Sequence, residues 1–321
     1  VPIFFNNKIN CNKKNIVYLR SFSKFISSRI YRLFLDTLSL IYKLRKSRIN
    51  NILFYNIDKQ TFLSVFLTKY LLKKNVFIIL ADNPNFRGKS FFDKLINYLT
   101  LKIDGVLVFN GNSLVNKNQQ LLHGIIEESN LIINDTKPNN NVIFSGSLGN
   151  TTGFELVLET ISKRSDINLY ITGKPYDYTN KQFETLIESY DKFININYLG
   201  LLDYQEYQDV LSKCDIALSL RNPSDEEHQY NFPSKILEYL SKSKFVISTL
   251  DYKGFSNKYL FKTEFNSSSL NSTLNKIYAL EQSEVLKIKR DIFIYLKNNY
   301  TNKQLVDKIN LMVSNNNEEN I

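Results

Sequence analysis

Apolar and polar stretches alternate along the chain with the periods of strands and helices. Short apolar runs at Asn51–Tyr55, Val76–Ala81 and Gly105–Phe109 predict buried strands. The stretches Thr61–Lys73 and Phe91–Lys102 between them have helical periodicity. Strands that are apolar throughout and separated by helices favour a parallel sheet covered on both faces.

The remaining elements of the first half are short or polar. The pattern predicts strands at Val1–Phe5, Asn15–Leu19 and His123–Ile126, and helices at Ile26–Arg48 and Asn112–Leu122.

A second alternating series follows the polar segment Asn134–Asn141, which contains Pro138 and reads as a linker. Strands are expected at Val142–Ser145, Ile167–Thr172, Ile194–Tyr198, Ile216–Leu220 and Phe245–Thr249. Helices are expected at Phe154–Lys163, Lys181–Tyr190, from Asp203 as the cap to Leu211, and near Ser268–Leu280 and Ser283–Asn299. The prediction is α/β, with two Rossmann-like domains facing a cleft: residues 1–138 and 139–300, then a helix or tail at 301–321 that frays at Asn315–Asn320.

The composition narrows the class of protein and its partners. The 321 residues are 43% hydrophobic, which is enough for packed cores, and no run of apolar residues is long enough to span a bilayer. Two cysteines, Cys11 and Cys214, form no disulfide framework and no metal motif, so we expect a reducing, cytoplasmic compartment. The net charge of +10 favours an anionic partner. No nucleic-acid-binding motif is present, and a lysine-rich composition alone would explain the charge.

The helix expected at Ile26–Arg48 carries much of this charge. Its cations are Arg29, Arg32, Lys43, Arg45, Lys46 and Arg48. Such a helix could lie on an anionic membrane at the inner face of the cell. A solvated basic face on a helix that packs against the core is an equal alternative.

The stretch 228–250 is the most informative for function. A polar loop leads into a helix expected from Ser234 to Lys242, which Asn231 or Ser234 would cap, with Pro233 in the first turn. The free amides of such a helix start attract phosphate. Lys235 adds a positive charge, and Glu238 lies one turn away, where it could bind sugar hydroxyls. This predicts a nucleotide-sugar site, although an ordinary capped helix with solvated Lys235 and Glu238 would show the same pattern.

Other residues that could bind the nucleotide sugar follow the strands of the second half. They are the glycine-rich turn Gly146–Gly153, the pair Gly173-Lys174, and Arg221. The turn matches neither the dinucleotide nor the P-loop fingerprint. Because the carboxyl ends of parallel strands meet at one edge, we expect these residues to converge with Ser234. In the first half, Asp82 opens a polar loop at the equivalent edge, and an ordinary turn is the favoured reading there.

Three segments carry a family resemblance. They are NFPSKILEYLSKSKFVIST, the turn SGSLG followed by Thr152-Gly153, and INYLGLLDYQEYQDVLSKCDIALSL. Over Val142–Leu250 the chain resembles the donor domain of family 4-type glycosyltransferases with the GT-B fold. The first half is similar only in architecture, with His123-Gly124-Ile125 resembling the last strand before the linker. The resemblance implies retaining sugar transfer from a nucleotide sugar without a bound metal or other cofactor, in bacterial capsule or lipopolysaccharide synthesis. It also implies that Glu238 holds the donor ribose.

The chain departs from the family pattern at several positions. Tyr230 stands where the family has the first glutamate of its Glu-x7-Glu motif, and Ser147 and Thr152 stand where it has two cations for the diphosphate. Ser243 replaces a glycine after the signature helix. The cations left for the diphosphate are Lys235, Lys174 and Arg221. The usual first strand and glycine-rich acceptor loop are not found, so a truncated N-terminal domain is expected.

The residues expected to bind the donor are therefore Gly146, Ser147, Gly149, Gly173, Lys174, Arg221, Tyr230, Asn231, Ser234, Lys235 and Glu238. Among them, Lys235 and Glu238 are also assigned to catalysis, together with Asp82, which is the candidate for acceptor contact or for a base. The acceptor would be a glycan or a lipid-linked sugar, and no Asp-x-Asp triplet suggests a metal site.

Two other functions remain open. A catalytically inactive nucleotide-sugar-binding homologue or subunit would explain Tyr230, Ser147 and Thr152. A membrane or nucleic-acid adaptor driven by charge is the third reading, and it predicts binding that is lost uniformly with salt.

Overall fold

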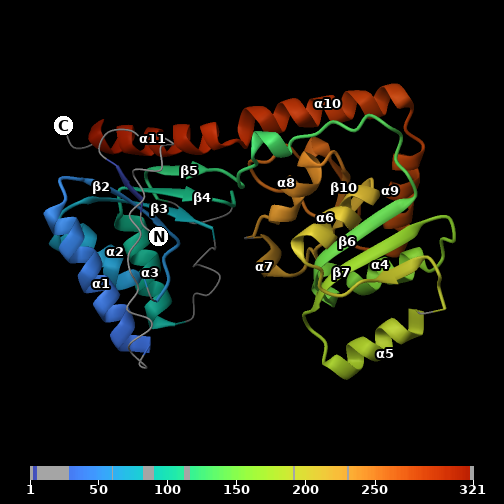
Figure 1. The fold of residues 1–321 in the computed structure, drawn as a ribbon, viewed down its shortest axis with the longest axis horizontal. Coiled ribbons are helices and arrows are strands. Elements are labelled where there is room, and N and C mark those ends of the chain that lie inside the picture. The colour runs from blue at the N-terminus through green and yellow to red at the C-terminus, as the bar shows by residue number, and fades with distance from the viewer. Residues whose placement is uncertain are drawn as a thin grey trace. The chain divides into compact units, whose positions relative to one another are not determined.

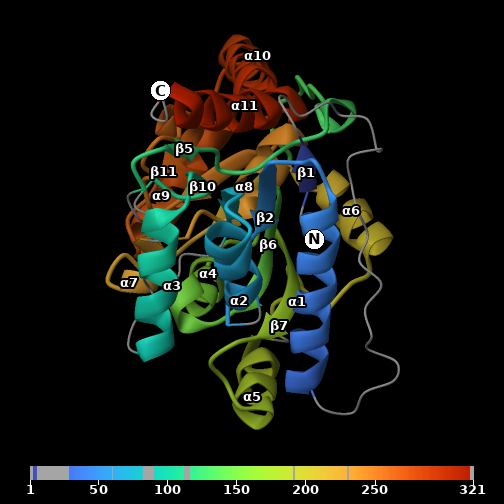
Figure 2. The same ribbon diagram turned by 90° about the vertical axis from the view of Figure 1, so that its left-hand side faces the viewer.

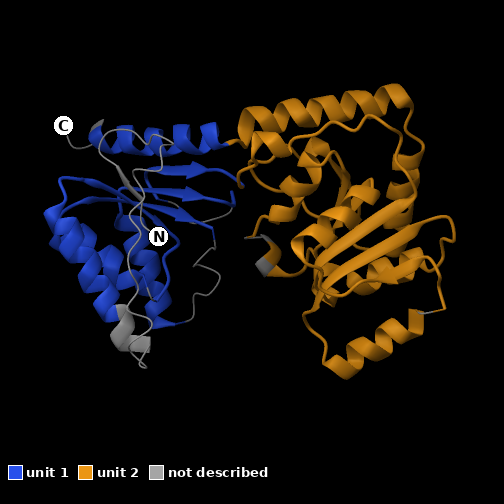
Figure 3. Cartoon of the chain, viewed as in Figure 1, with its two compact units in different colours: residues 1–123, 302–321 blue, residues 124–301 orange. Residues whose placement is uncertain are grey.

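The chain forms two compact α/β units (Figure 3). The first comprises Val1–His123 and Asn302–Ile321, and the second comprises Gly124–Thr301. This computed structural model describes residues 3–5, 29–59, 61–81, 90–111, 116–190, 192–229 and 231–318. The boundary between the units along the chain therefore lies at 123/124 rather than at the expected 138/139. The last segment of the chain belongs to the first unit.

The first unit is built on a five-stranded sheet with the order β1-β2-β3-β4-β5. Its strands are β1 (Ile3–Phe5), β2 (Asn51–Tyr55), β3 (Asn75–Leu80), β4 (Gly105–Val108) and β5 (Gln119–Leu121). All pairings are parallel except that of β1 with β2, which is antiparallel. The predicted parallel sheet is thus confirmed with one antiparallel strand added at its edge.

Helices cover both faces of this sheet (Figures 1 and 2). One face carries α1 (Arg29–Lys46), α2 (Phe62–Phe66), which continues as the π-helical turn η3 (Leu67–Leu71), and α3 (Phe91–Lys102). The other carries α11 (Asn302–Glu318). Alternate strand residues separate the two layers. For example, Ile52 and Phe54 join the core beneath α1 to α3, whereas the buried Leu53 between them has the opposite orientation.

Two predictions for the first half are wrong. Where a helix was expected at Asn112–Leu122, the described part contains β5, which pairs with β4 although its sequence is Gln-Gln-Leu. Strand pairing has overridden its weak strand propensity. The expected strand at His123–Ile126 is irregular instead, and the Ile126 amide donates to the Tyr300 carbonyl at 2.6 Å. The strand expected at Asn15–Leu19 lies outside the described residues.

The C-terminal segment is a helix rather than a frayed tail up to Glu318. Met312 and Val313 of α11 are buried, and α11 contacts β4 and β5. Asn118 also donates from its side-chain amide to the Met312 carbonyl at 2.5 Å. Burial of this apolar face stabilises a helix whose exposed side is polar.

The second unit has a six-stranded, fully parallel sheet with the order β11-β10-β9-β6-β7-β8. Its strands are β6 (Asn141–Leu148), β7 (Asn168–Pro175), β8 (Ile196–Tyr198), β9 (Ile216–Ser219), β10 (Phe245–Ser248) and β11 (Leu260–Lys262). Its helices are α4 (Phe154–Ile161), α5 (Asn180–Tyr190), α6 (Tyr204–Lys213), α7 (Glu226–Gln229), α8 (Ser234–Ser241), α9 (Ser267–Tyr278) and α10 (Gln282–Asn299). Short 3-10 turns occur at η4 (Glu128–Asn130), η5 (Asn150–Thr152) and η6 (Asn257–Tyr259). The polar loop before α8 contains α7 and is therefore less irregular than expected.

Two helical layers bury the faces of this sheet. Side chains of α4 and α9 share one core cluster with Phe144, Leu218 and Ile247 of the strands. On the opposite side, α8 packs on β9 and β10 and against α10. The expected α/β class and the two Rossmann-like units are therefore confirmed. No helix in the described ranges has the length and apolarity needed to traverse a bilayer.

Candidate functional site

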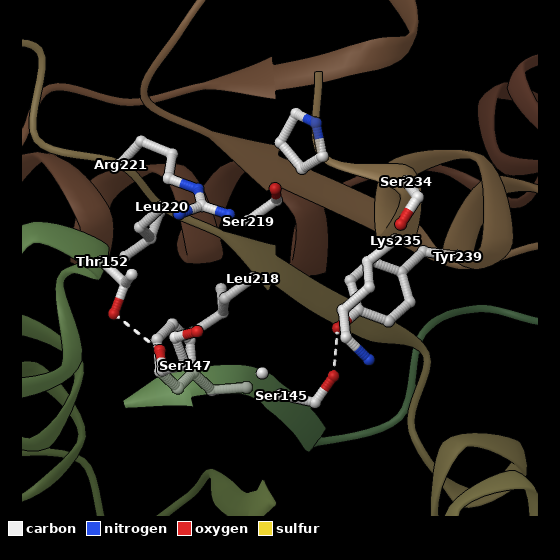
Figure 4. Close-up of a pocket in the computed structure, with 13 residues that line it drawn as sticks. Ser145, Ser147, Thr152, Leu218, Ser219, Leu220, Arg221, Ser234, Lys235 and Tyr239 are labelled. Atoms are coloured by element: carbon white, nitrogen blue, oxygen red, sulfur yellow. Dashed lines mark hydrogen bonds between the residues drawn. The ribbon is translucent and has the colours of Figure 1, made fainter. Parts of the chain in front are cut away.

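A hollow of about 210 Å³ opens at the carboxyl edge of the second unit's sheet (Figure 4). It lies between the end of β6, the end of β9 and the start of α8. Its lining comprises Phe144, Ser145, Gly146, Ser147, Thr152, Leu218, Ser219, Leu220, Arg221, Pro233, Ser234, Lys235 and Tyr239. Segments far apart in the sequence thus meet here, as expected for ligand sites of open parallel sheets.

A second hollow of about 470 Å³ adjoins the first. It is lined by Ser145, Gly146, Ser147, Thr172, Gly173, Lys174, Pro175, Tyr176, Leu201, Leu202, Tyr207 and Lys235. The two hollows share Ser145, Gly146, Ser147 and Lys235. Together they form one depression with Lys235 at the junction, and the second part has more apolar walls.

The end of β6 approaches β7 closely beneath this junction. Gly146 pairs with Gly173, so β6 continues to Leu148, into the segment that was expected to be a glycine-rich turn. A Cβ atom on Gly173 would lie 1.8 Å from the Gly146 carbonyl oxygen, and its φ of +142° favours glycine. Glycine at position 173 therefore allows the backbones of β6 and β7 to approach each other closely below the depression.

Three cations line the depression. Arg221 follows β9, Lys235 begins α8, and Lys174 ends β7. In Figure 4 the Arg221 guanidinium points into the first hollow, and Lys235 lies on its other side. The backbone amide of Arg221 donates a hydrogen bond to the Thr249 hydroxyl at 2.8 Å, which fixes the position of the Arg221 backbone. None of the three forms an ion pair with a carboxylate in the part of the chain that the structure describes.

The start of α8 differs from the expectation. Pro233 is the N-cap residue in an extended conformation, and no described side chain caps the helix, so neither Asn231 nor Ser234 has that role. Ser234 is instead the first helical residue, and the Ile236 amide donates to the Pro233 carbonyl at 3.0 Å. Amides of an uncapped first turn carry the positive end of the helix dipole, and Ser234 and Lys235 place them on the wall of the first hollow.

Lys235 and Glu238 meet at one tyrosine. The Lys235 amine lies 3.3 Å from the Tyr207 hydroxyl and 4.4 Å from the centre of its ring. The same hydroxyl donates to a Glu238 oxygen at 3.2 Å, and Gln208 donates to the other oxygen at 3.1 Å. Burial lowers the pKa of Lys235, and the charge of Glu238 opposes that shift. Burial, with neighbouring Tyr239 and Glu238, raises the pKa of Tyr207, so its phenol stays protonated.

A buried hydroxyl pair supports the floor beside this tyrosine. Tyr239 of α8 is fully buried, and its hydroxyl lies 2.6 Å from the Ser145 Oγ (Figure 4). The Thr152 hydroxyl donates to the Ser147 carbonyl at 2.8 Å. These contacts fix the end of β6 against α8 and against the turn that leads into α4.

The structure brings together seven of the predicted binding residues. Lining the two hollows are Gly146, Ser147, Gly173, Lys174, Arg221, Ser234 and Lys235. Glu238 lies behind the wall, where it contacts Tyr207 and Gln208. Asn231 is exposed and lines neither hollow, and Gly149 packs against the Asp177 carboxylate instead. Asp82 and Tyr230 lie outside the described residues.

Sequence reasoning missed Tyr207, Ser145, Ser219 and Tyr239. Tyr207 could have been found, because it lies one helical turn before the buried Leu211 and so on the inward face of α6. Among the described side chains no group of three or more His, Cys, Asp or Glu residues could hold a metal ion.

A family model described as "Glycosyl transferases group 1" matches residues 126–285 of this chain. The match spans most of the second unit, including β6 to β11 and α8. No curated protein sequence matches the chain.

Solved structures with similar folds cover most of the chain. Sucrose-phosphate synthase from Thermosynechococcus elongatus is 11% identical over 93% of this chain and 82% of its own, with a TM-score of 0.61. Anabaena Alr3699/HepE, solved in complex with UDP-glucose, is 11% identical over 88% of this chain and 82% of its own, with a TM-score of 0.62. The lipopolysaccharide outer core galactosyltransferase WaaB, in its apo form, is 13% identical over 90% and 82%, with a TM-score of 0.59. At these identities the likeness shows the fold, which is that of GT-B proteins.

Proposed function

The chain is a glycosyltransferase with the GT-B fold, and we propose that it transfers a sugar from a nucleotide-sugar donor to a glycan or lipid-linked acceptor. The observation that carries the proposal is the depression in the second unit. There, Arg221, Lys235, Lys174 and the uncapped start of α8 surround one space. Positive charge and free amides from separate segments suit a diphosphate.

We place the donor diphosphate in the first hollow, beside Arg221, Lys235 and the first amides of α8. The diphosphate gains negative charge as the bond to the sugar breaks. Cations and amides that bind this charge more strongly in the transition state accelerate the transfer. They would also replace the two cations that the family pattern has at Ser147 and Thr152.

We place the nucleoside in the second hollow, where Pro175, Tyr176, Leu201 and Leu202 offer apolar surface. Glu238 would accept hydrogen bonds from the ribose, as the family resemblance implies. Its carboxylate accepts a hydrogen bond from the Tyr207 hydroxyl, and Tyr207 lines the second hollow. The complex of Anabaena Alr3699/HepE with UDP-glucose supports a nucleotide sugar as donor.

We further propose that transfer retains the anomeric configuration and needs no divalent metal. The three protein cations supply positive charge where a metal would otherwise neutralise the diphosphate. Asp82 remains our candidate for acceptor contact or for a base, and Tyr230 for donor binding.

The proposed role is the synthesis of a bacterial surface polysaccharide such as capsule or lipopolysaccharide, on the cytoplasmic side of the membrane. The fold likeness to WaaB supports this class of acceptor. We propose peripheral contact with anionic lipid through α1, whose exposed Phe34, Leu38 and Tyr42 recur at the spacing of helical turns, and whose last turn carries Lys43, Arg45 and Lys46.

Turnover of donors tests this function. The purified chain is incubated with UDP-, GDP- and ADP-sugars and a lipid-linked glycan extract, with EDTA present, and nucleoside diphosphate release is measured. We expect release from one donor class and a product with the donor's anomeric configuration by NMR. Turnover that EDTA abolishes and manganese restores would contradict metal independence. A chain that binds a donor without releasing nucleotide would instead be an inactive binding homologue.

A further inference from the structure

Tyr207 is the contact point between Lys235 and Glu238. Its side chain comes from α6, whereas both partners come from α8. The hydroxyl accepts from the Lys235 amine at 3.3 Å and donates to Glu238 at 3.2 Å. Lys235 and Glu238 form no ion pair of their own. One phenol therefore connects the two charges that the proposed function assigns to the diphosphate and to the ribose.

The surroundings of this phenol restrict how it can act. Tyr207 lines the second hollow, and the Lys235 amine lies over its ring at 4.4 Å. An ammonium group over an aromatic face is attracted to it, and this holds the long lysine side chain in place. Gln208, the next residue of α6, donates to the other Glu238 oxygen at 3.1 Å. Both oxygens of Glu238 are thus oriented by α6.

We propose that Tyr207 is a positioning residue that couples recognition of the diphosphate by Lys235 to recognition of the ribose by Glu238. This inference rests on the proposed function. The phenol accepts a hydrogen bond from the amine and donates one to the carboxylate, so each contact polarises the other. The ring presents the amine at the junction of the two hollows. The nucleotide then meets a lysine and a glutamate that are already in fixed positions, which reduces the ordering required on binding.

A double-mutant cycle on nucleotide binding tests the coupling. Tyr207→Phe keeps the ring and removes the oxygen that serves both partners. We expect it to weaken binding of the preferred nucleoside diphosphate about 3- to 30-fold, the range for losing one or two ordinary hydrogen bonds. Tyr204→Phe is the matched control, because Tyr204 begins the same helix and is 73% exposed, and its affinity should equal that of the wild type.

The cycle with Lys235→Met separates positioning from simple packing. If Tyr207 acts through Lys235, then Tyr207→Phe should change affinity less than about twofold once Lys235 is absent. The same loss of effect is expected in the Glu238→Gln background. Melting temperatures without ligand verify folding. Tyr207→Leu, which also removes the ring, should weaken binding more than Tyr207→Phe.

The outcomes distinguish this inference from the proposed function. A wild type that binds none of UDP, GDP and ADP overturns both. A wild type that binds one of them, with unchanged affinity in folded Tyr207→Phe, overturns the coupling alone. Effects of Tyr207→Phe that add fully to those of Lys235→Met and of Glu238→Gln also overturn it.

Discussion

Lys289 of α10 is a buried cation outside the candidate site. It is 3% exposed, its amine donates to the Ser243 carbonyl, and it lies 3.7 Å from the centre of the Phe245 ring. Burial lowers its pKa to about 7, and Asp215 opposes the shift. The unfolded chain keeps this proton up to about pH 10.5, so between pH 7 and 10.5 it binds more protons than the folded chain. The free energy of unfolding therefore rises with pH across that window.

Lys289→Met should stabilise the protein most at and below pH 7, where the lysine would be charged while buried. We expect about 1–3 kcal/mol there, because apolar replacement of a buried charge removes its desolvation penalty. The gain should shrink between pH 7 and pH 10.5, where only the folded lysine loses its proton, and it should vanish above pH 10.5, where both lysines are neutral. Thermal unfolding across this range measures it, with the exposed Lys287→Met as control. A gain that is constant with pH would contradict the assignment.

Gly173 gives a second test at the scale of one residue. A Cβ atom there would lie 1.8 Å from the Gly146 carbonyl oxygen, at a φ of +142°. Gly173→Ala should therefore destabilise the second unit by roughly 2–5 kcal/mol through strain and overpacking. Gly200→Ala is the matched control, since its φ is +68° but nothing lies within 4 Å of the added carbon. It should cost only about 1 kcal/mol. Similar melting temperatures for the two variants would refute the close approach.

Elements with strong local signals could be predicted from the sequence. The helix Phe91–Lys102 and the strand Asn51–Tyr55 have the expected bounds. Asp203 caps α6 as predicted: its carboxylate accepts from the Glu206 amide at 2.9 Å. Elements fixed by tertiary contacts could not be predicted. The strand β5 could not be predicted because its sequence is polar. The cap of α8 could not be predicted because Pro233, in an extended conformation, is the N-cap residue, whereas the sequence offered Asn231 and Ser234 as capping residues.

The helix α1 carries a prediction for membranes. Its last turn has the exposed cations Lys43, Arg45 and Lys46. Each cation near an anionic surface contributes about 1 kcal/mol. Replacing all three with glutamine should thus weaken binding to phosphatidylserine vesicles roughly 100-fold. Flotation with anionic and neutral vesicles measures this, with Lys213, Lys276 and Lys287 of the second unit replaced as control. Equal binding to both kinds of vesicle would argue against the proposal.

At the scale of the whole molecule, the α/β class and the two Rossmann-like units were predictable because the apolar strands alternate regularly with helices. The extent of the first unit was not, because α11 joins it through contacts between residues that are distant in sequence. Most of the candidate site was predictable from glycines and cations that follow strands. The role of Tyr207 was not, since it depends on how α6 packs against α8.

The central claim is that the depression around Lys235 binds the diphosphate of a nucleotide. Calorimetric titration of UDP, GDP and ADP into the wild type, Lys235→Ala, Glu238→Gln and Lys242→Ala tests it most directly. We predict that the wild type binds at least one of them and that Lys235→Ala weakens this binding about 10- to 100-fold, as for a lost charged hydrogen bond. Glu238→Gln should also weaken it, and Lys242→Ala, at the C-cap of the same helix and outside both hollows, should not. Wild-type affinity in both Lys235→Ala and Glu238→Gln would contradict the account.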